Sequence, residues 1–91
     1  MIELITILQA NQTWYLNKIY VNSKHIVTIT ESHEHNKLLR EGKIQLSFDN
    51  NVVFSKLKME HSTGFNELIV VGCPATIMEK INRNSKQLLK G

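Results

Sequence analysis

The apolar residues of this chain are gathered into short runs rich in Ile and Val, and polar residues separate each run from the next. Such runs are typical of strands, because β-branched side chains pack well on a pleated surface. The first run, residues 2–8, is apolar on both faces of an extended chain, which predicts burial on both sides. We expect strands over residues 2–8, 14–21, 26–30, 43–48, 52–57 and 65–71.

The clearest hairpin signal lies in residues 43–57. Polar and apolar residues alternate strictly over 43–48, as expected for a strand with one buried face. Residues 49–51, an Asp followed by two Asn, suit a tight turn because these side chains tolerate the backbone angles that short loops need. Residues 52–57 are therefore predicted to return antiparallel to 43–48.

Residues 31–42 interrupt this pattern. They form the most polar stretch of the chain and contain a single pair of leucines. We expect a loop here, with at most a helical turn that ends at Gly42. Residues 59–64 are expected to form a second polar connection.

The change from strand to helix is marked by Gly72-Cys73-Pro74. Pro74 suits the first position of a helix, because its missing N–H would be unsatisfied there in any case. Ile77, Met78 and Ile81 follow at helical spacing and make one apolar stripe. We predict a helix from residue 74 to about 83, and leave open an extension to residue 90.

Together these elements predict one mainly β (α+β) domain over residues 1–91. The expected architecture is a small bent antiparallel sheet, or SH3-like half-barrel, of 5–6 strands with one C-terminal helix. A chain of 91 residues buries only a modest core, so association with itself or with a partner would add stability. The core is expected to contain Ile5, Ile7, Leu16, Ile26, Ile29, Ile44, Leu46, Phe48, Phe54, Ile69, Val71, Ile77 and Ile81.

The net charge of +3 arises in the last part of the chain. Acidic and basic residues balance as far as Cys73, and the excess comes from Lys80, Arg83, Lys86 and Lys90, which face only Glu79. These cations either attract phosphates or an acidic partner, or simply complement the dipole of a C-terminal helix.

The sequence points to a cytoplasmic protein with no membrane segment. The apolar N-terminal run ends after eight residues and contains Glu3, so it is too short for a membrane span or a signal peptide. Cys73 is the single cysteine and has no intrachain disulfide partner, which fits a reducing compartment.

No set of residues has the spacing of a catalytic or metal site. His33 and His35 could share a metal only on an extended chain and lack further ligands at a recognised spacing. Cys73 stands at a helix start, where its thiol pKa would fall, but no orienting third group accompanies it. We therefore predict no enzyme activity, no cofactor, no metal and no small-molecule substrate.

Three aromatic residues, Trp14, Tyr15 and Tyr20, lie near Lys18 and Lys24. Neighbouring residues on a strand point to opposite faces, so either Trp14 or Tyr15 is expected to be exposed. Exposed aromatic residues suit a protein contact, and aromatic residues among basic ones also suit single-stranded nucleic acid.

The segment Tyr20–Glu31, Tyr-Val-Asn-Ser-Lys-His-Ile-Val-Thr-Ile-Thr-Glu, resembles the small flagellar FlbD-like proteins. The order of an alternating hairpin and a final helix over about residues 19–82 is similar too. The chain departs from that family by inserting residues 32–42, adding the strand 65–71 and lacking a proline after Asn22. The resemblance implies a small cytoplasmic regulatory or adaptor protein without catalysis. In composition the chain also resembles small accessory proteins of bacteriophages.

We therefore expect a non-catalytic protein-binding, adaptor or structural module of bacterial or phage origin. It would bind a protein partner or form a homo-oligomer through its sheet edges, with Trp14, Tyr15 and Tyr20 as contact candidates. The alternative is a regulatory protein that binds nucleic acid through Lys80, Arg83, Lys86 and Lys90, with an exposed Trp14 or Tyr15 stacking on the bases.

Overall fold

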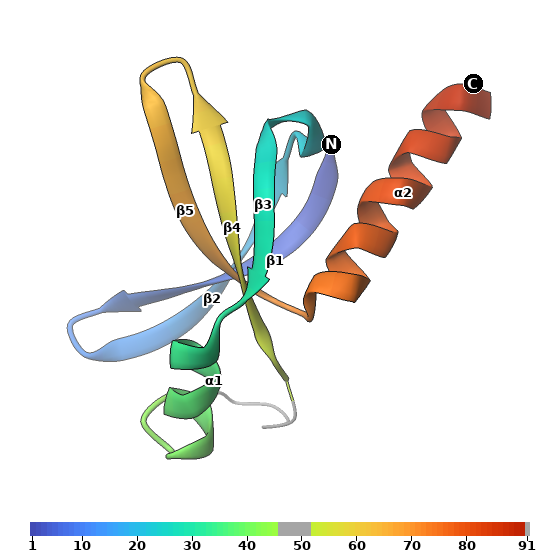
Figure 1. Ribbon diagram of the computed structural model, residues 1–91. Helices are drawn as coiled ribbons and strands as arrows, with labels where there is room; N and C mark the ends of the chain where they lie inside the picture. Colours follow the sequence, from blue (N-terminus) through green and yellow to red (C-terminus); the bar gives the residue numbers. More distant parts are fainter. Residues whose placement is uncertain (46–51, 91) are drawn as a thin grey trace.

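The computed structural model describes the backbone of residues 1–45 and 52–90, and the side chains of these residues up to Arg83. Its elements are β1 (Ile2–Ala10), β2 (Thr13–Val21), the 3-10 turn η1 (Ser23–His25), β3 (Ile26–Glu31), α1 (His33–Arg40), β4 (Phe54–His61), β5 (Gly64–Val71) and α2 (Pro74–Lys90). In this part of the chain the five strands form one open antiparallel sheet in the order β2-β1-β5-β4-β3 (Figure 1). The predicted fold class, α+β with a small antiparallel sheet and a C-terminal helix, is confirmed.

Two long hairpins build most of the sheet. β1 pairs with β2 along its whole length around a turn at Asn11 and Gln12, whose φ angles of 50° and 70° suit the twist of a tight hairpin. β4 pairs in the same way with β5. The hairpins meet where Thr6 lies opposite Val70, and they diverge on either side of that point (Figure 1). The sheet is therefore strongly bent.

The two faces of the sheet carry separate apolar clusters, because side chains alternate between faces along a strand. In β5, Val70 belongs to the first cluster and its neighbours Ile69 and Val71 to the second. α2 contributes Ile77 to the first cluster, and α1 contributes Leu39 to the second. Each helix thus covers part of one face.

The helix α1 corrects the prediction of a loop over residues 31–42. It ends in a Schellman motif: Gly42, at φ 75°, donates its N–H to the carbonyl of Leu39, and Lys43 donates to Leu38. The turn anticipated before Gly42 is therefore the last turn of a complete helix. The prediction went wrong because two leucines gave little apolar periodicity, whereas Asn36 is buried as well.

The predicted strand over residues 43–48 is wrong where the structure describes it. Residues 43–45 are irregular, and Ile44 is buried in the second cluster beside α1. Residues 46–51, with the predicted turn at 49–51, lie outside the described residues. The described partners of β4 are β3 and β5, and β4 continues through the connection predicted at 59–64 as far as His61.

The junction between β5 and α2 needs a glycine. Gly72 has a φ of 120°, which side-chain-bearing residues rarely adopt, and its N–H donates to the carbonyl of Val53 at 2.7 Å. Ser55 donates its hydroxyl to the Gly72 carbonyl at 2.6 Å, so both polar groups of this residue are satisfied. α2 then runs to Lys90, so it takes the extension beyond residue 83 that the sequence left open. Neither α1 nor α2, the helices of the described residues, is long and apolar enough to cross a membrane.

The predicted core is partly correct. Ile7, Ile44, Phe54 and Ile77 are buried, whereas Ile5 is 40% exposed although it shares a face of β1 with Ile7. Most of the other predicted residues pack at the edge of a cluster, and Leu46 and Phe48 lie outside the described residues. The buried apolar residues absent from the prediction are Ile2, Leu4, Val21, Leu39, Leu57, Met59 and Val70.

Candidate functional site

The outer edge of β3 has no strand partner within residues 1–45 and 52–90. β3 pairs with β4 on its inner side, and it ends the strand order at one side of the sheet, as β2 does at the other. An unpaired edge presents backbone N–H and C=O groups to which a further strand can bond.

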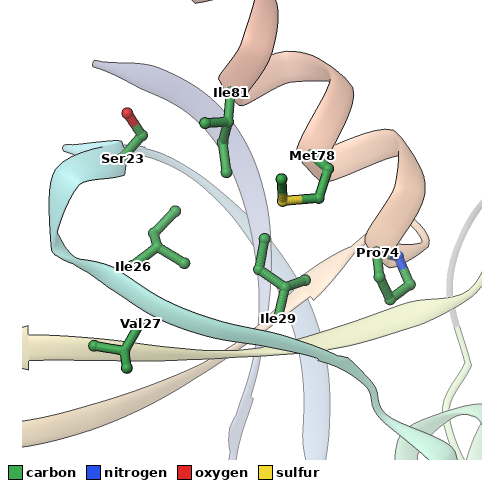
Figure 2. A pocket seen from close by; sticks show the side chains of 7 residues that line it. All are labelled: Ser23, Ile26, Val27, Ile29, Pro74, Met78 and Ile81. Carbon is green, nitrogen blue, oxygen red and sulfur yellow. The ribbon is translucent and has the colours of Figure 1, made fainter. Parts of the chain in front are cut away.

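A groove of about 370 Å³ runs between β3 and α2 (Figure 2). Six of its seven lining residues are apolar: Ile26, Val27 and Ile29 from the strand and Pro74, Met78 and Ile81 from the helix, with Ser23 at one end. Figure 2 shows Ile26 and Ile29 directed from the strand towards α2, and Met78 and Ile81 directed from the helix into the space above the strand. Val27 and Met78 are 49% and 45% exposed, so the groove has apolar surface left to cover.

A bulge in β3 shapes the floor of this groove. The pairing with β4 shifts between Ile26 and Thr28, so that Ile26 lies opposite Met59 and Ile29 opposite Leu57. In a regular strand two residues three apart would point to opposite faces. The extra residue, Val27, brings Ile26 and Ile29 to the same face, under α2.

The two ends of β3 carry opposite charges. Lys24 is exposed in η1, the turn that precedes the strand, and Glu31 is exposed at its last position. The Glu31 carboxylate accepts a hydrogen bond from Asn36 at 3.2 Å and lies 4.0 Å from the His33 ring. The charge on this edge therefore runs from basic to acidic along the strand.

The three predicted aromatic contacts do not form one platform. Trp14 is half-buried, and its ring packs edge-on against His35 with 5.9 Å between ring centres. Tyr15 and Tyr20 are 46% and 64% exposed, but they stand five positions apart on β2, so they point to opposite faces. Tyr20 shares its face with Ile5.

The basic residues of the tail are only partly described. Arg83 donates to Glu79, one helical turn away, at 2.8 Å, and Lys80 donates to the backbone carbonyl of Glu3 at 3.4 Å. Lys86 and Lys90 belong to α2, and their side chains lie outside the described residues.

The two histidines considered as metal ligands have different surroundings. His33 is exposed, whereas the His35 ring contacts Trp14 and Phe54 and shares a 2.8 Å hydrogen bond with the Ser32 hydroxyl. Burial lowers the pKa of His35, and nearby Lys56 acts in the same direction against Glu34. Among the described residues no three His, Cys, Asp or Glu side chains are grouped to hold a metal.

Cys73 is half-buried at the start of α2. Its sulfur lies 3.1 Å from the Thr76 hydroxyl, and the hydrogen bonds from Thr76 lower the pKa of the thiol. No histidine is found among the hydrogen-bond partners described for this sulfur.

Comparisons with family models, with curated proteins and with solved structures found no match to this chain. The resemblance to FlbD-like proteins therefore stays a prediction.

Sequence reasoning did not single out the groove, although two of its signals are visible. Ile77, Met78 and Ile81 were placed in one stripe, but Met78 is turned about 100° from Ile77 around the helix, so it covers a different surface. Val27 belongs to a run of β-branched residues that does not alternate with polar ones. Only the position of α2 beside an unpaired strand shows that these residues belong together.

Proposed function

We propose that this protein is a non-catalytic binding module that takes an extended segment of a protein partner along β3, with apolar side chains inserted under α2. The observation that carries this proposal is the combination of an unpaired strand edge with an apolar groove beside it. In strand addition, main-chain hydrogen bonds to the partner segment supply affinity. Specificity comes from a groove that accepts every second side chain of that segment.

The lining of the groove favours peptide side chains over a small polar ligand. Sites for small molecules combine an apolar wall with several polar groups that fix the orientation of the ligand. Here Ser23, at one end, is the single polar residue among those that line the groove. Apolar side chains presented by an extended backbone need no further polar partners there.

The alternative function, nucleic-acid binding through the tail, has less support. Arg83 and Lys80 already have hydrogen-bond partners, and Trp14 packs against His35. Exposed ion pairs are weak, so phosphates could still compete for these cations. Binding of an oligonucleotide in place of a peptide is therefore one outcome that an experiment must distinguish.

The test is a selection of peptides from a displayed random library on the immobilised full chain. Selected peptides should contain alternating apolar residues, and amide hydrogen exchange should slow in β3 when they bind. Met78→Glu and Val27→Glu should each weaken binding about tenfold or more, because either carboxylate would have to be desolvated in the groove.

Ile5→Glu is the matched control. Ile5 is a similarly exposed apolar residue, but it lies on the face of the sheet opposite α2. Loss of binding in this variant, with normal binding by the groove variants, would contradict the proposal. So would a chain that selects no peptide but binds a single-stranded oligonucleotide at low salt and loses this binding in Lys80→Ala/Arg83→Ala.

A further inference from the structure

We infer that the extended segment bound at this edge is β3 of a second copy, paired antiparallel with the first about a two-fold axis. This inference rests on the proposed function and names its partner. It follows from three properties of β3: the bulge, the distribution of charge and the position of α2.

The bulge determines a register in which apolar residues meet. In an antiparallel dimer about a two-fold axis, residues that lie opposite one another must point to the same face of the joined sheet. Ile26 and Ile29 share a face despite their spacing of three, so Ile26 of one copy can lie opposite Ile29 of the other. A regular strand would not allow this match.

The same register brings opposite charges together. With Ile26 opposite Ile29, the turn η1 of one copy, which carries Lys24, comes to lie near Glu31 of the other, and symmetry repeats the pair at the other end. Opposite charges across neighbouring strands stabilise the pairing, whereas like charges destabilise it. A parallel arrangement would place Lys24 against Lys24 and Glu31 against Glu31, so the charges select the antiparallel one.

The position of α2 is compatible with a shared apolar surface. The two-fold axis is perpendicular to the joined sheet, so both copies of α2 lie on the same side of it. Met78, at the rim of the groove, then flanks the axis in both copies. The exposed side chain of Met78 would become more buried against the second copy.

The experiment measures the association of the full chain and of two charge variants by sedimentation equilibrium at low salt. The natural chain should dimerise. Lys24→Glu and Glu31→Lys should each dimerise about tenfold more weakly, because each creates two like-charged pairs. An equimolar mixture of the two variants should recover dimer, and native mass spectrometry should show that this dimer contains one copy of each.

Recovery by mixing separates an interface from a folding defect, which mixing does not repair. If Glu31→Lys fails to fold because it loses the hydrogen bond from Asn36, Glu31→Gln keeps an acceptor there and should still weaken the dimer. A natural chain that stays monomeric at every concentration overturns the inference, as does a dimer that is indifferent to both charge changes. A monomer that nevertheless selects groove-dependent peptides leaves the proposed function standing, so the two failures are distinguishable.

Discussion

At the scale of single residues, His35 links α1 to the sheet. Its ring lies between Trp14 and Phe54 and hydrogen-bonds to Ser32, the residue that precedes the helix. Partial burial favours the neutral ring, which is why the pKa of His35 is lowered.

This lowered pKa predicts a loss of stability in mild acid. The unfolded chain binds a proton at His35 near the ordinary value of 6.5, before the folded chain does. The contribution of the neutral ring is therefore complete above that pH and is lost as the pH falls through it towards the lower folded pKa. Urea unfolding at about pH 7.5 and about pH 5.5 measures the difference. His35→Gln should reduce this pH dependence, and an unchanged difference between the two pH values would contradict this role for His35.

Asn36 is a second residue whose role depends on burial. Its side-chain oxygen accepts the N–H of Phe54 at 2.7 Å, and its amide donates to Glu31. We expect Asn36→Ala to reduce the free energy of unfolding by about 1–3 kcal/mol, because the buried Phe54 N–H loses its acceptor. Lys37→Ala, an exposed neighbour, should change it by less than about 0.5 kcal/mol. Equal effects in chemical unfolding would contradict this role for Asn36.

At the scale of elements, α2 divides its apolar residues between the core and the groove. Ile77 is 1% exposed and belongs to the first cluster, whereas Met78 is 45% exposed. Ile77→Ala should cost about 2–5 kcal/mol through lost burial and the cavity it leaves. Met78→Ala should cost about 1 kcal/mol or less, since nearly half of its surface is already exposed to solvent. Thermal unfolding of the two variants compares them, and a large loss for Met78→Ala would place this residue in the core instead.

The elements differ in how well the sequence predicts them. The five strands found here were expected because β-branched runs and polar turns are local signals, and Pro74 marked the start of α2. The helix α1 was not predicted because its buried side includes the polar Asn36, and the polar composition of the segment suggested a loop. The prediction of a strand at 43–48 was wrong at residues 43–45, because alternation indicates only that every second residue is buried. Ile44 is buried beside α1 although it does not lie in a strand.

The candidate site was harder to predict than the fold. Lys24 and Glu31 are ordinary surface residues in the sequence, and only the strand order reveals that the edge between them has no partner in the described part of the chain. The bulge at Val27 also depends on the pairing with β4 rather than on a local signal. A groove between segments that are distant in the sequence depends on tertiary structure, so local sequence patterns gave almost no indication of it.

At the scale of the whole molecule, one sheet joins two clusters that lie on its opposite faces. β5 contributes to both, and neighbouring residues within it serve different clusters. Neither cluster can come apart without disturbing strands that the other needs. The described residues should therefore unfold as one cooperative unit.

Leu57→Ala tests this cooperativity. Leu57 is buried in the first cluster, whereas Trp14, the single tryptophan, packs against the second. We expect the substitution to shift the unfolding curve from Trp14 fluorescence as far as the curve from far-ultraviolet circular dichroism. A tryptophan transition that stays in place while the other moves would show that the two clusters unfold independently.

The centre of β2, the other outer strand, carries Lys18, whose ammonium group is 3.0 Å from the Glu3 carboxylate. A unit that can join at both ends grows into an open-ended polymer, whereas a unit with one joining end stops at a pair. A lysine in the middle of an edge resists the approach of another strand, because its charge would have to be covered. If copies pair along β3 as proposed, we expect Lys18 to disfavour a further strand at the β2 edge, so that each copy joins one other and assembly ends at two copies.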